Sequence, residues 1–245
     1  MLVFTHILKL SLILLILIPE WCHAEDRYKE VSKELLPLFD RSDILIIGEK
    51  HGKEESPRLL AELAGAATQG RGCLTVALEI GSEQQEVVDA AMTGKANIAE
   101  IGVVPVIDHA GYRKMLNVLS RLSVAGRCLK VVAIDGEPEI IERDAWMAEK
   151  LAPYLGKGRV VALLGALHAA KDIRWDNGRE KAFLAERLEA KGVRVCSVVQ
   201  IWDSQGIGKV TPLTVEDVAD VLDPVAAKLP EDAREFGDYA VRWTR

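Results

Sequence analysis

Five short apolar segments constrain the fold of this chain more than any other feature of its sequence. Each segment is rich in valine, isoleucine and leucine, and polar residues barely alternate with the apolar ones. This pattern is typical of strands that are covered on both faces, as in a parallel sheet. The five segments are residues 44–48, 74–78, 129–134, 160–164 and 193–201.

Helical patterns fill the intervals between these segments and predict an α/β fold. Strands that alternate with helices indicate βαβ units with right-handed crossovers. We therefore expect a single α/β domain with a mainly parallel sheet of about five or more strands, flanked by helices. From residue 204 onward, glycine and proline recur, which predicts irregular coverage with one helix at 215–222. The other helical patterns cover residues 54–68, 83–92, 112–125, 138–155 and 179–191.

The N-terminus has the features of a secretory signal. A single cation precedes an apolar run that ends at Pro19, and the small residues Cys22 and Ala24 lie three and one positions before a cleavage point. The run is shorter than the ~20 residues that a spanning helix needs. An uncleaved N-terminal anchor is the alternative. We expect a signal peptide at 1–24 and an exported domain at 25–245, periplasmic or secreted, with no stable membrane anchor after cleavage.

The composition is that of a globular protein and narrows the partners of the chain. Hydrophobic residues make up 49% of the 245 residues, and the formal net charge is −6. This acidic balance argues against a nucleic-acid footprint, which needs a basic surface. It gives no reason to expect an anionic membrane surface as a partner. A small-molecule or peptide substrate fits the composition better than a nucleic acid.

Three cysteines remain after removal of the predicted signal: Cys73, Cys128 and Cys196. Cys73 and Cys128 each directly precede an apolar segment. If these two segments are neighbouring parallel strands in register, the two Cα atoms lie within bridging distance. The alternative is that all three cysteines are reduced and buried. Cys196 falls inside an apolar segment, which predicts a buried thiol.

An ionisable residue lies at or just past the carboxyl end of every apolar segment. In open parallel sheets, ligands bind outside those ends. Solvation alone explains one or two acidic residues at such positions, but it explains less well why two histidines lie there too. The residues are Glu49 and His51, Glu79, Asp135, His168 and Asp203.

The two histidines share the motif G-x-x-H after an apolar segment, which singles them out. With Glu49 and Glu79, His51 and His168 suit a divalent metal such as manganese, cobalt or zinc. Alternatively, a carboxylate orients a histidine that acts as a general base on water. Both routes lead to hydrolysis. A histidine that merely caps the sheet edge is the structural alternative, and His109 is interpreted as a surface residue.

Arg143 follows the third apolar segment and can reach back over the sheet edge. There it is suited to stabilise an oxyanion or to bind a substrate carboxylate. A structural ion pair with Glu79, Asp135 or Glu139 is the alternative. The neighbouring Asp144 is interpreted as solvated.

Four ordered sequence stretches resemble a known superfamily. They are DILIIGEKHGKEESPRLLAELA, VALEI, RDAWMAEKL and VVALLGALHA. They are similar to the group that joins erythromycin esterases, TIKI proteases, TraB/PrgY/GumN proteins and ChaN haem-binding proteins. The resemblance implies a shared α/β core and implicates Glu49, His51, Glu79, Arg143 and His168. It implies water activation in the esterase branch, a divalent metal in the TIKI branch and haem in the ChaN branch.

These observations lead to one main hypothesis and two competitors. The main hypothesis is an exported hydrolase of ester or amide bonds, with His51, Glu49, Glu79, Arg143 and His168 as catalytic residues. The metal-dependent version of this hypothesis uses His51, His168, Glu49 and Glu79 as ligands. The first competitor is a ChaN-like protein that binds haem or another ligand without catalysis. The second is a structural member of the group whose polar cluster only stabilises the fold.

Overall fold

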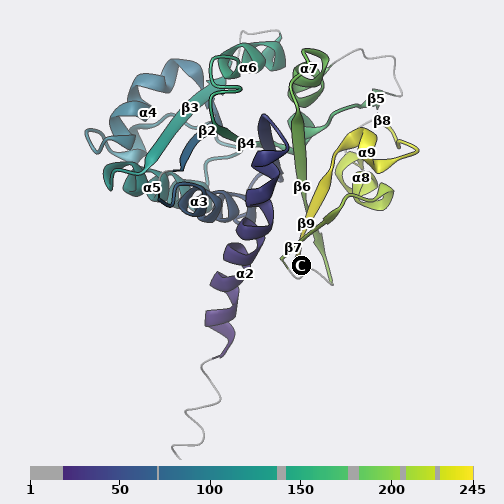
Figure 1. Ribbon diagram of the computed structural model, residues 1–245, viewed down its shortest axis with the longest axis horizontal. Helices are drawn as coiled ribbons and strands as arrows, with labels where there is room; N and C mark the ends of the chain where they lie inside the picture. The colour runs from purple at the N-terminus through teal and green to yellow at the C-terminus, as the bar shows by residue number, and fades with distance from the viewer. Residues whose placement is uncertain are drawn as a thin grey trace, which may run out of the picture.

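The computed structural model has a seven-stranded sheet at its centre (Figure 1). It describes residues 19–70, 72–136, 142–175, 182–204, 208–223 and 227–244, with side chains from residue 27 onward. The strands are β1 (Ile44–Glu49), β2 (Cys73–Gly81), β3 (Cys128–Asp135), β4 (Arg159–Gly165), β6 (Val195–Asp203), β7 (Lys209–Pro212) and β9 (Tyr239–Thr244). Their order is β3-β2-β4-β1-β6-β9-β7, and a separate short pair joins β5 (Arg174–Trp175) to β8 (Ala227–Lys228).

The mainly parallel sheet confirms the predicted fold class. All five apolar segments form strands, and these five strands pair in parallel with one another. β9 adds a sixth parallel strand beside β6, whereas β7 is antiparallel to β9. The carboxyl ends of the predicted strands therefore meet at one edge of the sheet, the carboxyl edge.

Helices cover both faces of the sheet, as the near-continuous apolar segments require. On β1, the side chains of Leu45 and Ile47 join one core cluster, and those of Ile44 and Ile46 join another. Alternate residues of a strand point to opposite faces, so each segment supplies both cores. The first core packs against α2 (Pro19–Leu35), α3 (Glu55–Ala67), α4 (Gln85–Met92) and α5 (Ala110–Val124), and the second against α6 (Arg143–Leu151) and α7 (Leu184–Ala190).

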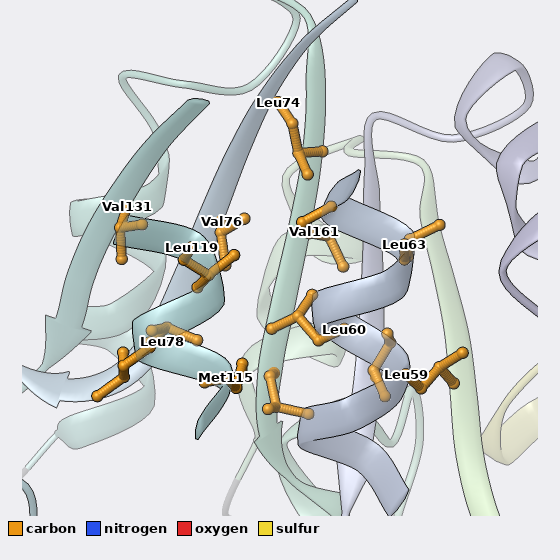
Figure 2. Packing of buried hydrophobic residues seen from close by; sticks show 14 of the residues in the cluster. Leu59, Leu60, Leu63, Leu74, Val76, Leu78, Met115, Leu119, Val131 and Val161 are labelled. Carbon is orange, nitrogen blue, oxygen red and sulfur yellow. The ribbon is translucent and has the colours of Figure 1, made fainter. Parts of the chain in front are cut away.

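In the first core, leucines from α3 meet the strands. Figure 2 shows Leu59, Leu60 and Leu63 of α3 facing the sheet, with Met115 and Leu119 of α5 beside them. All five side chains are essentially excluded from solvent. Their spacing of three and four residues places them on one stripe of each helix, which is what an amphipathic helix on a sheet needs.

The expectation of irregular structure in the C-terminal region is wrong in part. The helix α8 (Val215–Leu222) is confirmed, but residues 209–212 and 239–244 form β7 and β9 rather than loops. β9 is short and carries Arg242 in its middle, so it lacks the apolar run that marks the other strands. Its inward side chains still bury well, with Ala240 and Val241 inaccessible to solvent. With α9 (Ala233–Phe236), this region forms a third core cluster.

Two further differences concern helix boundaries. The pattern at 138–155 forms α6 at Arg143–Leu151, and the pattern at 179–191 forms α7 at Leu184–Ala190. Residues 137–141 and 176–181 lie outside the described residues. Short 3-10 turns lie at Leu36–Asp40, Ser82–Gln84, Ile98–Glu100 and Ala166–Ala169, the last of which is called η4.

The N-terminal helix α2 was not predicted. It begins at Pro19 and continues through the expected cleavage point to Leu35. Tyr28 stacks on Trp243 of β9 with ring centroids 4.9 Å apart, and Arg58 of α3 lies over the Tyr28 ring. Residues 1–18 of the predicted signal lie outside the described residues. Among the described helices, none combines the length and apolar character needed to cross a membrane.

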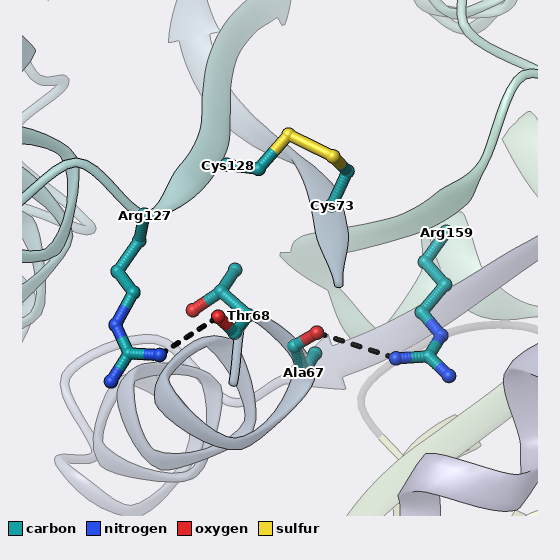
Figure 3. Close-up of a disulfide and its surroundings, with 6 residues drawn as sticks. All are labelled: Ala67, Thr68, Cys73, Arg127, Cys128 and Arg159. Carbon is teal, nitrogen blue, oxygen red and sulfur yellow. Dashed lines mark hydrogen bonds between the residues drawn. A yellow bond between two sulfur atoms is a disulfide. The ribbon is translucent and has the colours of Figure 1, made fainter. Parts of the chain in front are cut away.

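A disulfide joins the amino ends of β2 and β3 (Figure 3). Cys73 and Cys128 are direct partners in the parallel register, and their Cα atoms lie 4.6 Å apart. This confirms the bridged alternative. Cys196 is free and buried, and burial raises the pKa of its thiol to about 12.

The same edge of the sheet holds the end of α3. Arg127 donates to the carbonyl of Thr68 at 3.0 Å, and Arg159 donates to the carbonyl of Ala67 at 3.3 Å (Figure 3). These carbonyls are among the last of the helix and have no partner within it. Cations at a helix C-terminus also interact favourably with the helix dipole. We call this side of the sheet the amino edge.

Candidate functional site

The structure brings all five predicted site residues to the carboxyl edge. Glu49 ends β1, and Glu79 lies near the end of β2, on the far side of β4 in the sheet. His51 follows β1 in the next loop, and His168 lies in η4, directly after β4. Arg143 begins α6, the helix that follows β3. Because β4 lies between β2 and β1, residues from four segments of the chain converge on the ends of three adjacent strands.

Glu49 and His51 form a hydrogen-bonded pair. Nδ1 of His51 lies 2.9 Å from Oε1 of Glu49. The Glu49 side chain is 2% exposed, whereas that of His51 is 32% exposed. The hydrogen bond to Glu49 raises the pKa of His51, and burial and Arg143 oppose this rise only in part. With the proton of the neutral ring on Nδ1, Nε2 carries the basic lone pair.

Two glycines explain why the motif at these strand ends is G-x-x-H. A Cβ atom on Gly165 would lie 3.2 Å from Nε2 and Cε1 of His51. A Cβ atom on Gly48 would lie 3.0 Å from the Cα of Ala166. Gly48 of β1 therefore allows the close approach of the segment after β4, and Gly165 of β4 allows the close approach of the segment after β1. The two motifs are built against each other across the β1–β4 pair.

His168 belongs to a second acid–histidine pair, and this pair corrects the interpretation of Asp144. Nδ1 of His168 lies 2.5 Å from Oδ1 of Asp144, and both side chains are buried. Asp144 is therefore not solvated. The ring of Phe183 packs edge-on against the His168 ring, with centroids 5.6 Å apart.

Arg143 links the buried carboxylates into one network. Its guanidinium donates to both oxygens of Asp135 at 2.5 Å and to Oε1 of Glu79 at 2.6 Å. The backbone N–H of Gly165 donates to Oε2 of Glu79 at 2.8 Å. Burial raises the pKa of Glu79, but His168, the Gly165 N–H and Arg143 together outweigh burial and lower this pKa below its ordinary value. The hydrogen bonds to Asp135 raise the pKa of Arg143.

His168 and Glu79 approach each other without a hydrogen bond. Nε2 of His168 lies 3.8 Å from Oε1 of Glu79, which exceeds hydrogen-bond length. Glu79 is therefore the central acid of the site. Arg143 and Gly165 bind it, His168 faces it, and its charge reaches His51 as well.

The predicted metal set is not formed. His51, His168, Glu49 and Glu79 converge, but the described residues contain no group of three histidine, cysteine or carboxylate side chains placed to hold one ion. The physical reason is that the carboxylates already have partners. Arg143 and Gly165 occupy both oxygens of Glu79, and His51 occupies Oε1 of Glu49. A divalent ion bound by Oε1 of Glu79 would compete with the guanidinium of Arg143.

Other candidate residues lie outside this network. Asp203 pairs with Arg242 of β9 at 3.1 Å, so its strand end contributes no charge to the cluster. His109 precedes α5 and is partly buried rather than a plain surface residue. Trp175 packs against Phe183, with ring centroids 5.9 Å apart. Sequence reasoning missed the role of Asp144, and its only signal was its position beside Arg143.

The comparisons with known proteins rest on structure rather than sequence. No family model and no curated protein matches the chain. The erythromycin esterase EreC, in its open conformation, superimposes with a TM-score of 0.62 at 11% identity, over 86% of this chain and 92% of that one. A protein from Bacillus cereus gives a TM-score of 0.62 at 12% identity, over 87% and 91%. ChaN of Campylobacter jejuni, which binds haem cofacially, gives 0.55 at 13% identity, over 85% and 90%.

The chain therefore shares its fold with these ChaN and erythromycin esterase structures. The resemblance inferred from the four sequence stretches is confirmed for the fold. At 11–13% identity the likeness extends to the fold alone. An esterase and a haem-binding protein share this fold, so the fold alone does not choose between the two activities.

Proposed function

We propose that the chain hydrolyses an ester or amide bond at the carboxyl edge, with His51 as the general base. The observation that carries this proposal is the Glu49–His51 pair. A buried carboxylate orients Nδ1, and the partly exposed ring carries its basic lone pair on Nε2. An acid that holds a histidine in the basic tautomer is the arrangement used by hydrolytic triads.

The reaction follows from the chemistry of these groups. Nε2 of His51 takes a proton from water, and the resulting hydroxide attacks the substrate carbonyl carbon. Glu49 stabilises the imidazolium that forms. The proton then passes from Nε2 to the leaving alcohol or amine as the tetrahedral intermediate collapses. Arg143, whose side chain is 36% exposed, is the cation nearest to a developing oxyanion in this network.

The charge of the site favours some substrates over others. Four carboxylates, those of Glu49, Glu79, Asp135 and Asp144, face one guanidinium and two imidazoles. This acidic excess disfavours polyanions and suits a neutral or cationic substrate. It agrees with the expectation of a small-molecule or peptide substrate rather than a nucleic acid.

The test replaces His51 while keeping its hydrogen bond. In His51→Gln, the side-chain amide can still donate to Glu49 but cannot take a proton. On a substrate found by screening esters and amides, we expect kcat to fall by roughly 10²–10⁴-fold, the usual contribution of a general base. Lys50→Ala, an exposed neighbour in the same loop, should keep full activity. Full turnover in His51→Gln would refute the proposed role.

Haem binding is a second candidate, and two observations favour it. ChaN of Campylobacter jejuni shares the fold. In addition, a partly exposed imidazole whose Nδ1 is held by a carboxylate suits a ligand of haem iron. His51 is therefore the residue that would hold haem. Bound in this way, haem would be cargo or a redox group.

A hemin titration separates the two candidates. Binding predicts a Soret shift in the wild type that His51→Ala abolishes, with no turnover of any ester or amide. The hydrolase predicts turnover that hemin does not require. Tyr112 and Tyr154 are the tyrosines to replace alongside His51 if a Soret shift persists.

We also infer that the chain is exported, with cleavage after Ala24. The disulfide between Cys73 and Cys128 supports this inference, because such bonds persist mainly in oxidising compartments. The N-terminal sequence of protein recovered from the periplasm or culture medium tests it. Protein that is found inside the cell with residues 1–24 still attached would contradict this inference.

A further inference from the structure

Buried polar atoms without partners gather where β1, α3 and α5 meet. Oε2 of Glu49, Oγ of Ser56, Nε2 of His109 and the hydroxyl of Tyr112 have no hydrogen-bond partner among the described residues. Glu49 ends β1, Ser56 lies in the first turn of α3, and His109 and Tyr112 lie at the start of α5. Buried polar groups are almost always hydrogen-bonded, to protein or to ordered water. Four such atoms on these adjoining segments therefore point to a partner that is not a protein side chain.

Glu49 and Tyr112 lie on the same face of the sheet. Leu45 and Ile47 point to the core that contains Tyr112, and Glu49 continues the same alternation along β1. The Tyr112 side chain is completely buried. Burial raises the pKa of Tyr112 well above its ordinary value, and the charge of Glu49 adds more to this rise than any other. The phenol and the carboxylate are therefore within electrostatic reach, although they are not directly hydrogen-bonded.

We infer that Tyr112 positions Glu49 through one internal water molecule. The phenol donates to the water, and the water donates to Oε2 of Glu49. Ser56 and His109 supply further acceptors at the same junction, so the water has the two to four partners that buried waters have. The catalytic consequence rests on the proposed function, whereas the Tyr112–water–Glu49 contact does not.

The Tyr112–water–Glu49 contact would help to orient His51, the proposed general base. His51 already occupies Oε1 of Glu49, and the water would occupy Oε2. A carboxylate held at both oxygens has one orientation, and it holds the His51 ring in one orientation in turn. A donor on Oε2 also moderates the negative charge that Glu49 presents to the imidazole. Tyr112 would thus act on His51 without touching substrate.

Tyr112→Phe tests the inference because it removes only the hydroxyl. We expect the pKa of His51, followed by NMR in the full-length protein, to rise further, since Glu49 loses a donor and binds the imidazolium more strongly. Glu79 and Arg143, the other charges that face His51, are unchanged by this variant. We expect a lower melting temperature as well, because Oε2 loses its partner. An unchanged His51 pKa, with a melting temperature equal to or above that of the wild type, would overturn the inference.

Tyr154→Phe is the matched control. Tyr154 lies below Lys130, which stacks on its ring near the start of β3, so the His51 pKa should not change. If hydrolysis is found, Tyr112→Phe should lower kcat by about tenfold at unchanged KM, the equivalent of one charge-assisted hydrogen bond. A shifted His51 pKa without any turnover would leave Tyr112 as a positioning residue and reject the hydrolase. Turnover that depends on His51 but not on Tyr112, with no pKa shift, would reject the inference alone.

Discussion

The two edges of the same sheet are built in different ways. At the amino edge, a disulfide and two arginines on helix carbonyls tie β2, β3 and α3 together. At the carboxyl edge, four buried carboxylates meet one guanidinium and two imidazoles. The amino edge thus contains cross-links that cost little to maintain. The carboxyl edge contains buried charges, which are expensive to desolvate.

The amino edge therefore contributes mainly to stability, whereas the carboxyl edge contains the reactive groups. A cross-link restricts the unfolded chain and needs no special environment. A buried carboxylate beside an arginine gains little net stability compared with an apolar pair, but it becomes harmful once its partner is removed. Perturbed pKa values cluster at functional sites for the same reason. We therefore expect variants at the two edges to separate stability from histidine chemistry.

The largest expected effect is on stability at the amino edge. Replacing both Cys73 and Cys128 with alanine opens a cross-link across a separation of 55 residues. The loop-closure model assigns such a bond about 4 kcal/mol of unfolding free energy. Both cysteines are exposed, so no cavity adds to the loss. Urea denaturation measures it, and the wild type under reducing agent should match the double variant.

The same variant also tests the separation of the two edges. At a temperature where it stays folded, the His51 pKa should equal that of the wild type. A shifted pKa would mean that the disulfide also shapes the carboxyl edge.

The next effect is expected at Arg143. Arg143→Met leaves the buried carboxylates of Glu79 and Asp135 without their cation, which should cost about 3 kcal/mol at neutral pH. Arg234→Met removes a comparable pair from the surface, where the arginine side chain is 82% exposed. Exposed pairs contribute about 0–1 kcal/mol, so this control should be close to neutral.

The pH dependence gives the Arg143 prediction its sign. The pKa of Glu79 is lowered in the folded protein, so its contribution is present above its ordinary pKa and is lost as pH falls through the folded value. In Arg143→Met, Glu79 can be protonated at low pH without the loss of an ion pair to this arginine. The stability gap between the variant and the wild type should therefore narrow below about pH 4. A gap that is constant from pH 7 to pH 3 would contradict this account.

The sequence predicted the parts of this structure that depend on local pattern. The five apolar segments identify β1 to β4 and β6 because burial on both faces requires uninterrupted apolar side chains. β9 escaped prediction because Arg242 interrupts its pattern and pairs with Asp217 on α8. The sequence did not decide whether the disulfide forms, because the bond depends on the register of β2 and β3, which only the assembled sheet fixes.

The sequence predicted which residues form the candidate site, but not the hydrogen bonds and ion pairs between them. Strand ends indicated Glu49, Glu79 and His168, since parallel strands deliver their carboxyl ends to one edge. The pairing of His168 with Asp144 spans 24 residues and depends on where α6 begins over η4. The metal hypothesis depends on the same step. Ligand types can be counted from sequence, but the arginine that neutralises them is seen only in three dimensions.

A smaller effect concerns the pH dependence of the Glu49–His51 pair. The hydrogen bond to Glu49 raises the pKa of His51 above its ordinary 6.5, and the base works only when neutral. Turnover should therefore fall as pH drops through a value above 6.5. In Glu49→Gln the amide oxygen still accepts from Nδ1 but carries no charge, so the acid limb should move to lower pH. An unmoved limb, by rate or by NMR titration, would remove Glu49 from the mechanism.

The smallest effect is expected at Arg127, on the same edge as the disulfide. Arg127→Ala removes one donor from the carbonyl of Thr68, and such a cation at a helix C-terminus contributes about 0.3–1 kcal/mol. Arg159→Ala should cost a similar amount through Ala67. Each arginine binds a different carbonyl, so the double variant should lose the sum within about 0.5 kcal/mol, by urea denaturation. A much larger loss would mean that the amino edge, like the carboxyl edge, is a coupled network, and the contrast between the two edges would not hold.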